Sequence, residues 1–258
     1  MHISELADEL RAEQEALDAV VAALDGPAWL TPTPSPGWSV RDQIGHLTYF
    51  DGTAALAITD PAAFERSKAA LLGSGDPDGL TLHRDEPPAG LLVAWRANRR
   101  ALAQAAAGLE GSERLPWYGP SMGARSFLTA RLMETWAHGQ DVVDAVGGDR
   151  TPTDRLRHIA QLGFITRGWT YANRGEQPPS GDVRLELVAP SGELWRYGPD
   201  GAADVVRGPA EDFCLVVTQR RHVDDTTLEV TGPAARDWMT KAQAFAGAAT
   251  DGPRPRSA

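Results

Sequence analysis

The hydrophobic pattern of the chain changes near residue 178, and this change limits the possible folds more than any other feature. Before it, apolar residues recur at the spacing of amphipathic helices. After it, the stretch V-R-L-E-L-V (183–188) alternates with the period of two that is typical of a half-buried strand. The sequence therefore predicts an all-helical N-terminal part and a smaller C-terminal part that mixes strands with helices.

Proline, glycine and a capping motif divide the N-terminal part into helices. The first helix is expected to stop at Gly26-Pro27. Ser39 and Asp42 form an S-x-x-D capping box that can begin the next helix, with Trp38 directly before it. Three further long helices are predicted over residues 89–109, 121–146 and 152–173.

The C-terminal part reads as a small α/β arrangement. A turn at Ser191-Gly192 joins the first strand to a hairpin partner, and two more strands and two proline-initiated helices follow. We predict a helical bundle over residues 1–175, an α+β domain over 181–250 and a disordered tail over 251–258.

The charge balance and the single cysteine exclude several classes of protein. The 258 residues carry a net charge of -10, which argues against nucleic acid and anionic membranes as partners. Cys214 has no second cysteine with which to form an internal disulfide, and no apolar run reaches the ~20 residues of a membrane span. The N-terminus does not resemble a signal peptide. We expect a cytoplasmic protein, either a monomer or a homodimer.

A possible metal site is the strongest chemical feature of the sequence. Glu134 and His138 stand four residues apart, so they share one face of a predicted helix, and Asp141 could orient His138 from the same face. His46 lies in another apolar-periodic helix and could complete a His2Glu set that suits zinc, with nickel or iron also possible. The spacing alone does not decide between a metal site and the ordinary alternatives, which are a surface ion pair for Glu134 and His138 and a core or boundary position for His46.

Two segments give the chain a resemblance to a known group of proteins. W-S-V-R-D-Q-I-G-H-L (38–47) and A-R-L-M-E-T-W-A-H-G-Q-D-V (130–142) resemble the DinB-like superfamily, and specifically its mycothiol-dependent maleylpyruvate isomerase branch. The resemblance implies a four-helix bundle that binds a metal through His46, Glu134 and His138. It also implies a small C-terminal α/β domain similar to sterol-carrier folds.

The resemblance further implies a thiol-dependent enzyme. In that branch the low-molecular-weight thiol mycothiol is the cosubstrate, and a metal-bound thiolate attacks an electrophilic small molecule. The outcome would be either isomerisation or S-transfer. Cys214 lies in the apolar segment F-C-L-V-V, so we expect it to be inert core rather than the nucleophile.

Arginine and aromatic residues are candidates for binding the substrate and the thiol. Arg96 and Arg221 are our first choices for holding a carboxylate, because the guanidinium fork matches it. Trp117 and Tyr118 could line the pocket, and Arg125 could lie at its rim. Each of these residues also has an ordinary structural explanation, as a solvated arginine or a tight entry into the following helix.

Two rival functions remain open from the sequence. The same scaffold could hold a thiol-independent, metal-assisted hydrolase or lyase, or it could be a non-enzymatic protein that binds a small molecule. An acid-rich loop, D-P-D-G-L-T-L-H-R-D-E-P-P (76–88), also bears on the substrate. If this loop lies near the metal, the substrate should be less anionic than a dicarboxylate such as maleylpyruvate.

Overall fold

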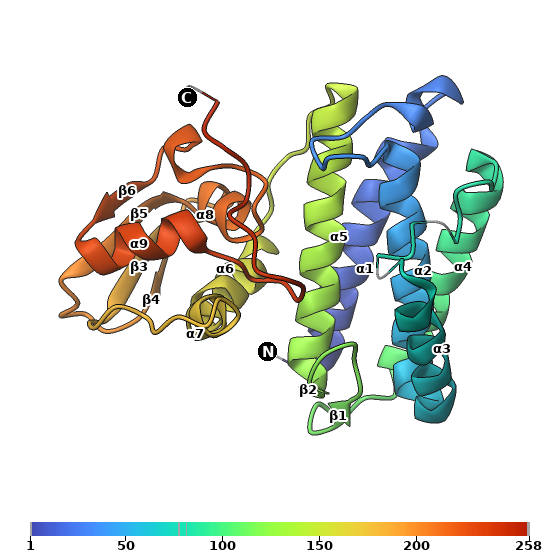
Figure 1. Cartoon of the computed structure of the whole chain (residues 1–258), viewed down its shortest axis with the longest axis horizontal. Coiled ribbons are helices and arrows are strands. Elements are labelled where there is room, and N and C mark those ends of the chain that lie inside the picture. The colour runs from blue at the N-terminus through green and yellow to red at the C-terminus, as the bar shows by residue number, and fades with distance from the viewer. Residues whose placement is uncertain (1, 77, 81, 257–258) are drawn as a thin grey trace. The chain divides into compact units, whose positions relative to one another are not determined.

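The chain folds into two compact units, Met1–Asp149 and Arg150–Ala258. The computed structural model describes residues 2–76, 78–80 and 82–256. The first unit is helical and the second combines a sheet with helices, as the sequence predicts (Figure 1). Among the described residues, we find no helix that is both long enough and apolar enough to cross a bilayer.

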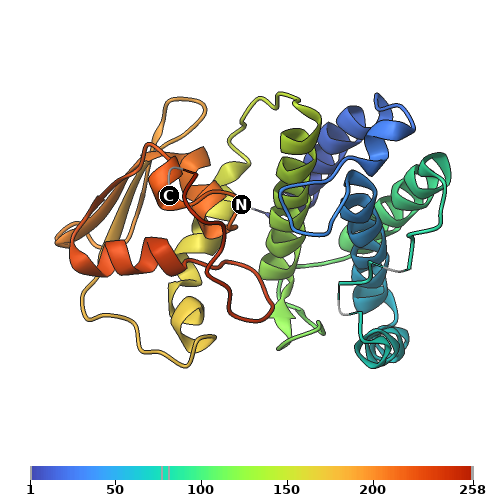
Figure 2. The ribbon, with the colours of Figure 1, turned by 45° about the horizontal axis from the view of Figure 1, so that its top comes forward.

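Four long helices form the bundle of the first unit. Helix α2 packs against α4 and α5, and α1 packs against α5 and α4; Figure 2 shows the four helices from a second direction. Helix α3 lies against α2. The unit consists of α1 (Ile3–Ala22), the short 3-10 helix η1 (Pro27–Leu30), α2 (Val40–Thr59), α3 (Pro61–Ser74), α4 (Pro88–Ala106), β1 (Arg114–Leu115), β2 (Met122–Gly123) and α5 (Ala124–Val146).

The predicted capping box at the start of α2 is confirmed. The Ser39 hydroxyl accepts the backbone N–H of Asp42, and the Asp42 carboxylate accepts the backbone N–H of Ser39 at 2.8 Å. The start of α5 differs from the prediction, because β1 and β2 form a two-stranded hairpin before it. Arg114 donates from Nε to the Ser121 hydroxyl at 3.2 Å, so Ser121 belongs to the hairpin and α5 begins only at Ala124.

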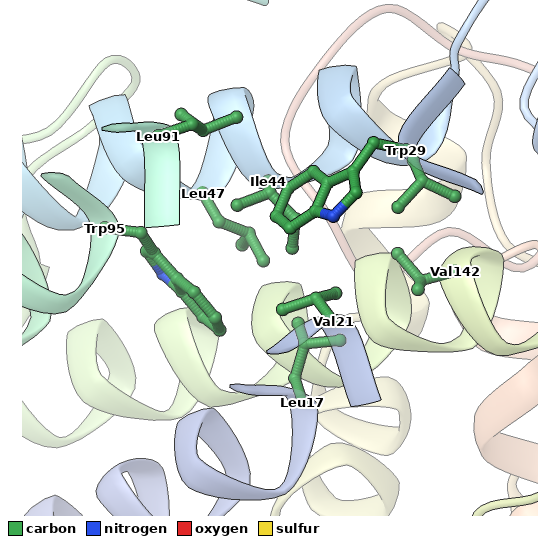
Figure 3. Close-up of a cluster of buried hydrophobic side chains, with 9 residues drawn as sticks. Leu17, Val21, Trp29, Ile44, Leu47, Leu91, Trp95 and Val142 are labelled. Atoms are coloured by element: carbon green, nitrogen blue, oxygen red, sulfur yellow. The ribbon is translucent and has the colours of Figure 1, made fainter. Parts of the chain in front are cut away.

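The apolar core of the first unit joins all four helices of the bundle (Figure 3). Two tryptophans, Trp29 after α1 and Trp95 on α4, bury their rings in this cluster. Burial of each large side chain contributes on the order of 2–3 kcal/mol. The remaining members of the cluster are Leu17, Val21, Val40, Ile44, Leu47, Leu91 and Val142.

A buried ion pair between Asp51 and Arg131 joins α2 to α5, next to the Trp95 ring of this core. Asp51 is fully buried and accepts hydrogen bonds from Arg131 Nε at 3.2 Å and Nη2 at 2.9 Å. Its second oxygen accepts from Gln14 at 3.0 Å and from the Trp95 indole at 3.1 Å. Because each oxygen of the carboxylate accepts two hydrogen bonds, the buried charge of Asp51 is stabilised in the interior.

The second unit contains a four-stranded sheet in the order β4-β3-β5-β6. Strand β3 pairs antiparallel with β4 and parallel with β5, and β5 pairs antiparallel with β6. Val183, Leu185 and Leu187 are buried on one face of β3. The elements are α6 (Leu156–Ile165), α7 (Arg167–Ala172), β3 (Val183–Val188), β4 (Leu194–Tyr197), β5 (Asp204–Pro209), α8 (Ala210–Val217), the 3-10 helix η2 (Val223–Asp225), β6 (Glu229–Thr231) and α9 (Pro233–Lys241).

The two compact units divide earlier in the chain than the change of hydrophobic pattern does. The single helix predicted over 152–173 is two helices, α6 and α7, and both pack within the second unit, α6 on α8 and α7 on α9. Gly163 allows the close approach of α6 to α8, because a Cβ there would lie 2.8 Å from Val217 Cγ2. Periodicity identified residues 152–173 as helical but carried no information about the partner of that helix.

Part of the predicted tail makes defined contacts. Asp251 forms an ion pair with Arg174 at 2.8 Å, and the backbone N–H of Arg256 donates to Asp225 at 3.0 Å. Residues 257 and 258 of the predicted tail lie outside the described part of the chain.

Candidate metal centre

Three predicted ligands, His46, Glu134 and His138, meet between two helices of the bundle. One ligand atom from each lies within 4.8 Å of the other two. Oε2 of Glu134 is 3.1 Å from His138 Nε2 and 3.9 Å from His46 Nε2. The structure therefore brings His46 next to Glu134 and His138, which lie 88 and 92 residues further along the chain.

Local helix geometry explains how the three side chains converge. Glu134 and His138 are one turn apart on α5, which places them on the same face. His46 lies on α2, the neighbour of α5 in the bundle. His46 and His138 are buried, and Glu134 is half-buried.

The outer nitrogen of each imidazole faces a hydrogen-bond acceptor. His46 Nδ1 lies 2.9 Å from the backbone oxygen of Asp78, and His138 Nδ1 lies 2.5 Å from Oε1 of Gln43. An acceptor at Nδ1 holds a ring proton there, so Nε2 is the nitrogen that would offer its lone pair to a metal. Both Nε2 atoms point towards Glu134, which is the arrangement of histidines that ligate metals in proteins.

The donor set fits a divalent transition metal. Metal–ligand bonds of about 2.0–2.1 Å in a tetrahedral site separate the ligand atoms by roughly 3.3 Å, and the two distances to Glu134 lie on either side of that value. Two imidazoles and a carboxylate suit zinc, and also nickel or iron. Three protein ligands would leave a further coordination position for a small molecule.

The surroundings of Glu134 favour its charged form. Burial alone would raise the pKa of this carboxylate, but the adjacent imidazoles of His138 and His46 outweigh burial and hold the pKa well below its usual value. The same negative charge attracts either a protonated imidazole or a metal ion into this space. Glu134 is thus ready to act as a ligand at neutral pH.

Aromatic rings cover the histidine pair. The Trp38 ring stacks on His138 with centroids 5.6 Å apart and is tilted against His46 at 5.3 Å. The Phe50 ring is also tilted against His46, with the two ring centroids 4.4 Å apart. Trp117 and Tyr118, which were predicted to line the pocket, pack near Phe50, with ring centroids 6.2 and 5.1 Å from its own. They are therefore part of the same aromatic cluster, one ring removed from His46.

The acid-rich loop lies against the metal-site half of α2. Besides the contact of Asp78 with His46, Arg84 lies 3.9 Å from Asp42 near the start of α2. Gly45 permits this approach, since a Cβ there would lie 3.3 Å from Cβ of His83. Residues 77 and 81 of the loop lie outside the described part of the chain.

Other predicted site residues have different surroundings. Arg96 donates from Nε and Nη2 to Asp18 at 2.8 and 2.5 Å, which joins α4 to α1 rather than lining the α2–α5 pair. Arg125 lies beside Gly111. It precedes Glu134 by nine residues on α5, which separates the two residues by about 13 Å along the helix axis. The structure does not bring either arginine to the three ligands.

Asp141, predicted to orient His138, and Arg221, predicted to hold a carboxylate, make other contacts, and both roles stay predictions. Asp141 is buried on α5 and accepts a hydrogen bond from the Ser35 hydroxyl at 3.0 Å, while Gln43 is the group at His138 Nδ1. Arg221 belongs to the second unit, where it donates to the backbone oxygen of Arg220 at 2.8 Å.

Sequence reasoning missed Gln43, Phe50 and the covering role of Trp38. One signal was present for Gln43, which is an amide three positions before His46 and therefore on the same side of the predicted helix. The contact of Asp78 uses a backbone oxygen, so side-chain chemistry gave no indication of it.

Comparisons with known proteins identify the family. A family model described as the mycothiol maleylpyruvate isomerase N-terminal domain matches residues 10–143, just over half of the chain, and includes all three ligands. The chain belongs to this family. The expected resemblance to this branch is thereby confirmed.

Two relatives similar to this chain are uncharacterized proteins of Mycobacterium tuberculosis, MT0041 of strain CDC 1551 / Oshkosh and Rv0036c of strain H37Rv. Each is 45% identical over 242 residues, which covers 93% of this chain and 94% of the relative.

Two solved structures share the fold of this family member. They are the mycothiol-dependent maleylpyruvate isomerase, with a TM-score of 0.58 and 17% identity, and a histidine-to-alanine mutant of it, with a TM-score of 0.59 and 16% identity. Each match covers 91% of this chain and 96% of the other. The similarity confirms the predicted combination of a helical bundle with a small α/β domain.

Proposed function

We propose that this protein is a metal-dependent enzyme that uses a low-molecular-weight thiol, of the mycothiol type, against an electrophilic small molecule. The reaction would be an isomerisation through reversible thiol addition or an S-transfer in which the thiol stays on the product. The observation that carries the proposal is the convergence of His46 Nε2, His138 Nε2 and Glu134 Oε2, with an acceptor on each outer nitrogen.

The residues of the chain would divide the work as follows. His46, Glu134 and His138 would hold a divalent ion, which in such a site supplies an open position where a thiol loses its proton near neutral pH. Trp38 and Phe50 would exclude water from the imidazoles, because their rings already cover both. Trp117 and Tyr118 would extend this aromatic wall towards the substrate and the thiol.

The nucleophile would come from outside the chain. Cys214 is fully buried, and burial raises the pKa of its thiol well above the usual value. The single cysteine is therefore held as the neutral thiol, unsuited to attack. An external thiol fits both this finding and the name of the family.

We also propose that the substrate is less anionic than a dicarboxylate. The less anionic substrate was expected if the acid-rich loop lies near the metal, and this loop contacts the metal-site half of α2. The buried Arg131 is neutralised by Asp51 and the guanidinium of Arg96 by Asp18. Binding of a substrate carboxylate by Arg96 would have to break the latter pair, so we do not assign Arg96 that role in the proposal.

The test is consumption of an electrophile by the purified full-length protein with mycothiol, with another thiol, or with no thiol. Each reaction is run on zinc-loaded and chelator-treated protein, with Glu15→Gln as the matched control for Glu134→Gln because Glu15 is an exposed carboxylate on α1. We expect activity only with metal and thiol together, lost in Glu134→Gln and retained in Glu15→Gln.

Each alternative function predicts a different result. Metal-dependent turnover without any thiol would replace the proposal with a hydrolase or lyase. Tight binding of small molecules without turnover would favour a binding protein. A preference for dicarboxylates over neutral electrophiles of equal reactivity would contradict the proposed substrate class alone.

A further inference from the structure

The side chain of Gln43 is placed to control the chemistry of His138. It is fully buried on α2, one turn before His46, and reaches across to α5. Its Oε1 lies 2.5 Å from His138 Nδ1, while Nε2 of the same imidazole faces Glu134 at 3.1 Å. The two nitrogens of His138 thus have separate partners, one structural and one in the ligand cluster.

The hydrogen-bond directions around Gln43 follow from a chain of donors. The backbone oxygen of Trp38 can only accept, so the Thr33 hydroxyl, 2.9 Å away, must donate to it. The Thr33 oxygen then has only lone pairs for Gln43, and it accepts from Gln43 Nε2 at 2.9 Å. This fixes which end of the amide is nitrogen and leaves Oε1 towards His138.

The orientation of the amide sets the tautomer of His138. A carbonyl oxygen has no proton to give, so the hydrogen bond between Gln43 and Nδ1 requires the proton to be on Nδ1. Nε2 of the same ring faces Oε2 of Glu134 at 3.1 Å, and a metal ion bound there would use the Nε2 lone pair while the proton stays on Nδ1. His46 reaches the same state through a backbone oxygen, which any residue at position 78 would supply.

We propose that Gln43, held by Thr33 and the Trp38 carbonyl, is a positioning residue that locks His138 in the Nδ1–H tautomer needed for metal binding. The metal part of this inference rests on the proposed function, whereas the tautomer itself does not. The relay also links the tautomer to the cover of the site, because the ring of Trp38 stacks on the same imidazole.

The loop that carries this relay is well anchored. The backbone N–H of Thr33 donates to the Trp38 oxygen at 2.7 Å, and that of Trp38 donates to the Ser35 oxygen at 3.0 Å. Val40 N–H donates to the Thr31 oxygen at 3.0 Å, which ties the loop to the start of α2. A relay built on fixed backbone groups can hold one amide orientation, as a positioning role requires.

The first measurement is the tautomer of His138 in metal-free protein that carries Glu134→Gln, because the Glu134 carboxylate, 3.1 Å from Nε2, would otherwise hold a proton on that nitrogen too. Two-bond ¹⁵N–¹H correlations of the imidazole, assigned by comparison with His138→Gln, are recorded at a pH where the rings are neutral. In this background we expect the Nδ1–H form when Gln43 is present and the Nε2–H form to become dominant in Gln43→Leu, which removes the acceptor. Thr33→Val should give a mixture, and Thr33→Ser, which keeps the hydroxyl, should give the spectrum of the background protein.

The second measurement is the zinc affinity of the Gln43 and Thr33 variants, made in the full-length protein with Glu134 intact, by competition with a chelating dye. Loss of a group that orients a histidine ligand typically weakens metal binding by about 10–100-fold. We expect this loss in Gln43→Leu, a smaller loss in Thr33→Val, and wild-type affinity in Thr33→Ser. If Gln43→Leu does not fold, Thr33→Val against Thr33→Ser carries the comparison.

The outcomes separate this inference from the proposed function. An unchanged tautomer and unchanged zinc affinity in a folded Gln43→Leu or Thr33→Val would overturn the positioning role. The expected tautomers, together with a wild-type protein that takes up no metal, would instead overturn the metal site and would leave the control of His138 by Gln43 standing.

Discussion

A single oxygen, Oε2 of Glu134, is approached by Nε2 of two imidazoles from different helices. Its position between His138 and His46 explains why the pKa of this carboxylate stays well below its usual value despite burial. At the residue scale the account therefore depends on charge: a carboxylate completes the donor set, and a neutral group of the same shape does not.

Glu134→Gln tests this dependence on charge. The amide keeps the size of the side chain but is a poor metal ligand, so zinc affinity should fall by more than the roughly 10–100-fold typical of losing an orienting group. Isothermal titration calorimetry, in which zinc is added to chelator-treated protein, measures the change in affinity. Glu15→Gln is the control. Wild-type affinity in Glu134→Gln would remove Glu134 from the site.

At the scale of the elements, charged contacts and close helix approaches hold the bundle and the sheet unit. Asp18 on α1 accepts hydrogen bonds from Arg96 and Arg99 on α4. In the second unit, Gly163 lets α6 approach α8. Each contact predicts a change of stability that leaves the three metal ligands in place.

Asp18→Asn should destabilise the protein in a pH-dependent way. The hydrogen bond from Arg96 leads the causes that lower the pKa of Asp18 below its ordinary value of 3.8. A lowered pKa contributes stability that is present above the unfolded value and lost as the pH falls through the folded one. We expect the variant to lose about 1–3 kcal/mol at pH 7, with the gap closing below about pH 4. Urea unfolding at several pH values measures it; a gap independent of pH would contradict the ion pair.

Gly163→Ala should destabilise the second unit by overpacking. The new Cβ would lie 2.8 Å from Val217 Cγ2 and 3.1 Å from Phe213 Cε1, and such overlaps cost about 1–3 kcal/mol. The control is Gly168→Ala on α7, where no atom lies within 4 Å of the added Cβ and a gain of about 0.5–1 kcal/mol is expected. Equal thermal stability of the two variants would argue against the α6–α8 contact.

The elements that the sequence predicted well are those that local chemistry determines. The capping box of Ser39 and Asp42 begins α2, and strand β3 has the predicted bounds, 183–188, because its alternation reports one buried face. The β1–β2 hairpin has only two residues in each strand, too few for a period to be visible. The break at Thr166 between α6 and α7 falls within a helical apolar pattern and has no proline to mark it in the sequence.

The candidate site shows the same division between local and tertiary information. Glu134 and His138 are visible from helical spacing, whereas His46 was a candidate from its apolar-periodic helix and became the expected third ligand only through the resemblance to a family. Gln43 and Trp38 matter through contacts with α5 that only the folded chain defines. The arginines were the weakest prediction, because a guanidinium on a helix surface has many possible partners, and Arg96 takes Asp18.

At the scale of the whole molecule, all three ligands and the Gln43 relay lie within the first compact unit. We therefore expect a fragment of residues 1–149 to bind zinc with an affinity within about tenfold of the full chain, measured with the same chelating dye. Helical circular dichroism of the fragment is the control for folding. A folded fragment without zinc affinity would mean that the second unit supplies part of the site.

The most direct test of the central claim is the metal content of the full-length protein, purified without added metal or chelator and measured by elemental analysis. The account predicts about one zinc, nickel or iron per chain in the wild type, falling close to zero in Glu134→Gln. A wild-type protein that contains no metal, and takes up none on titration, would contradict it and leave His46, Glu134 and His138 as an ordinary charged cluster within a helical bundle.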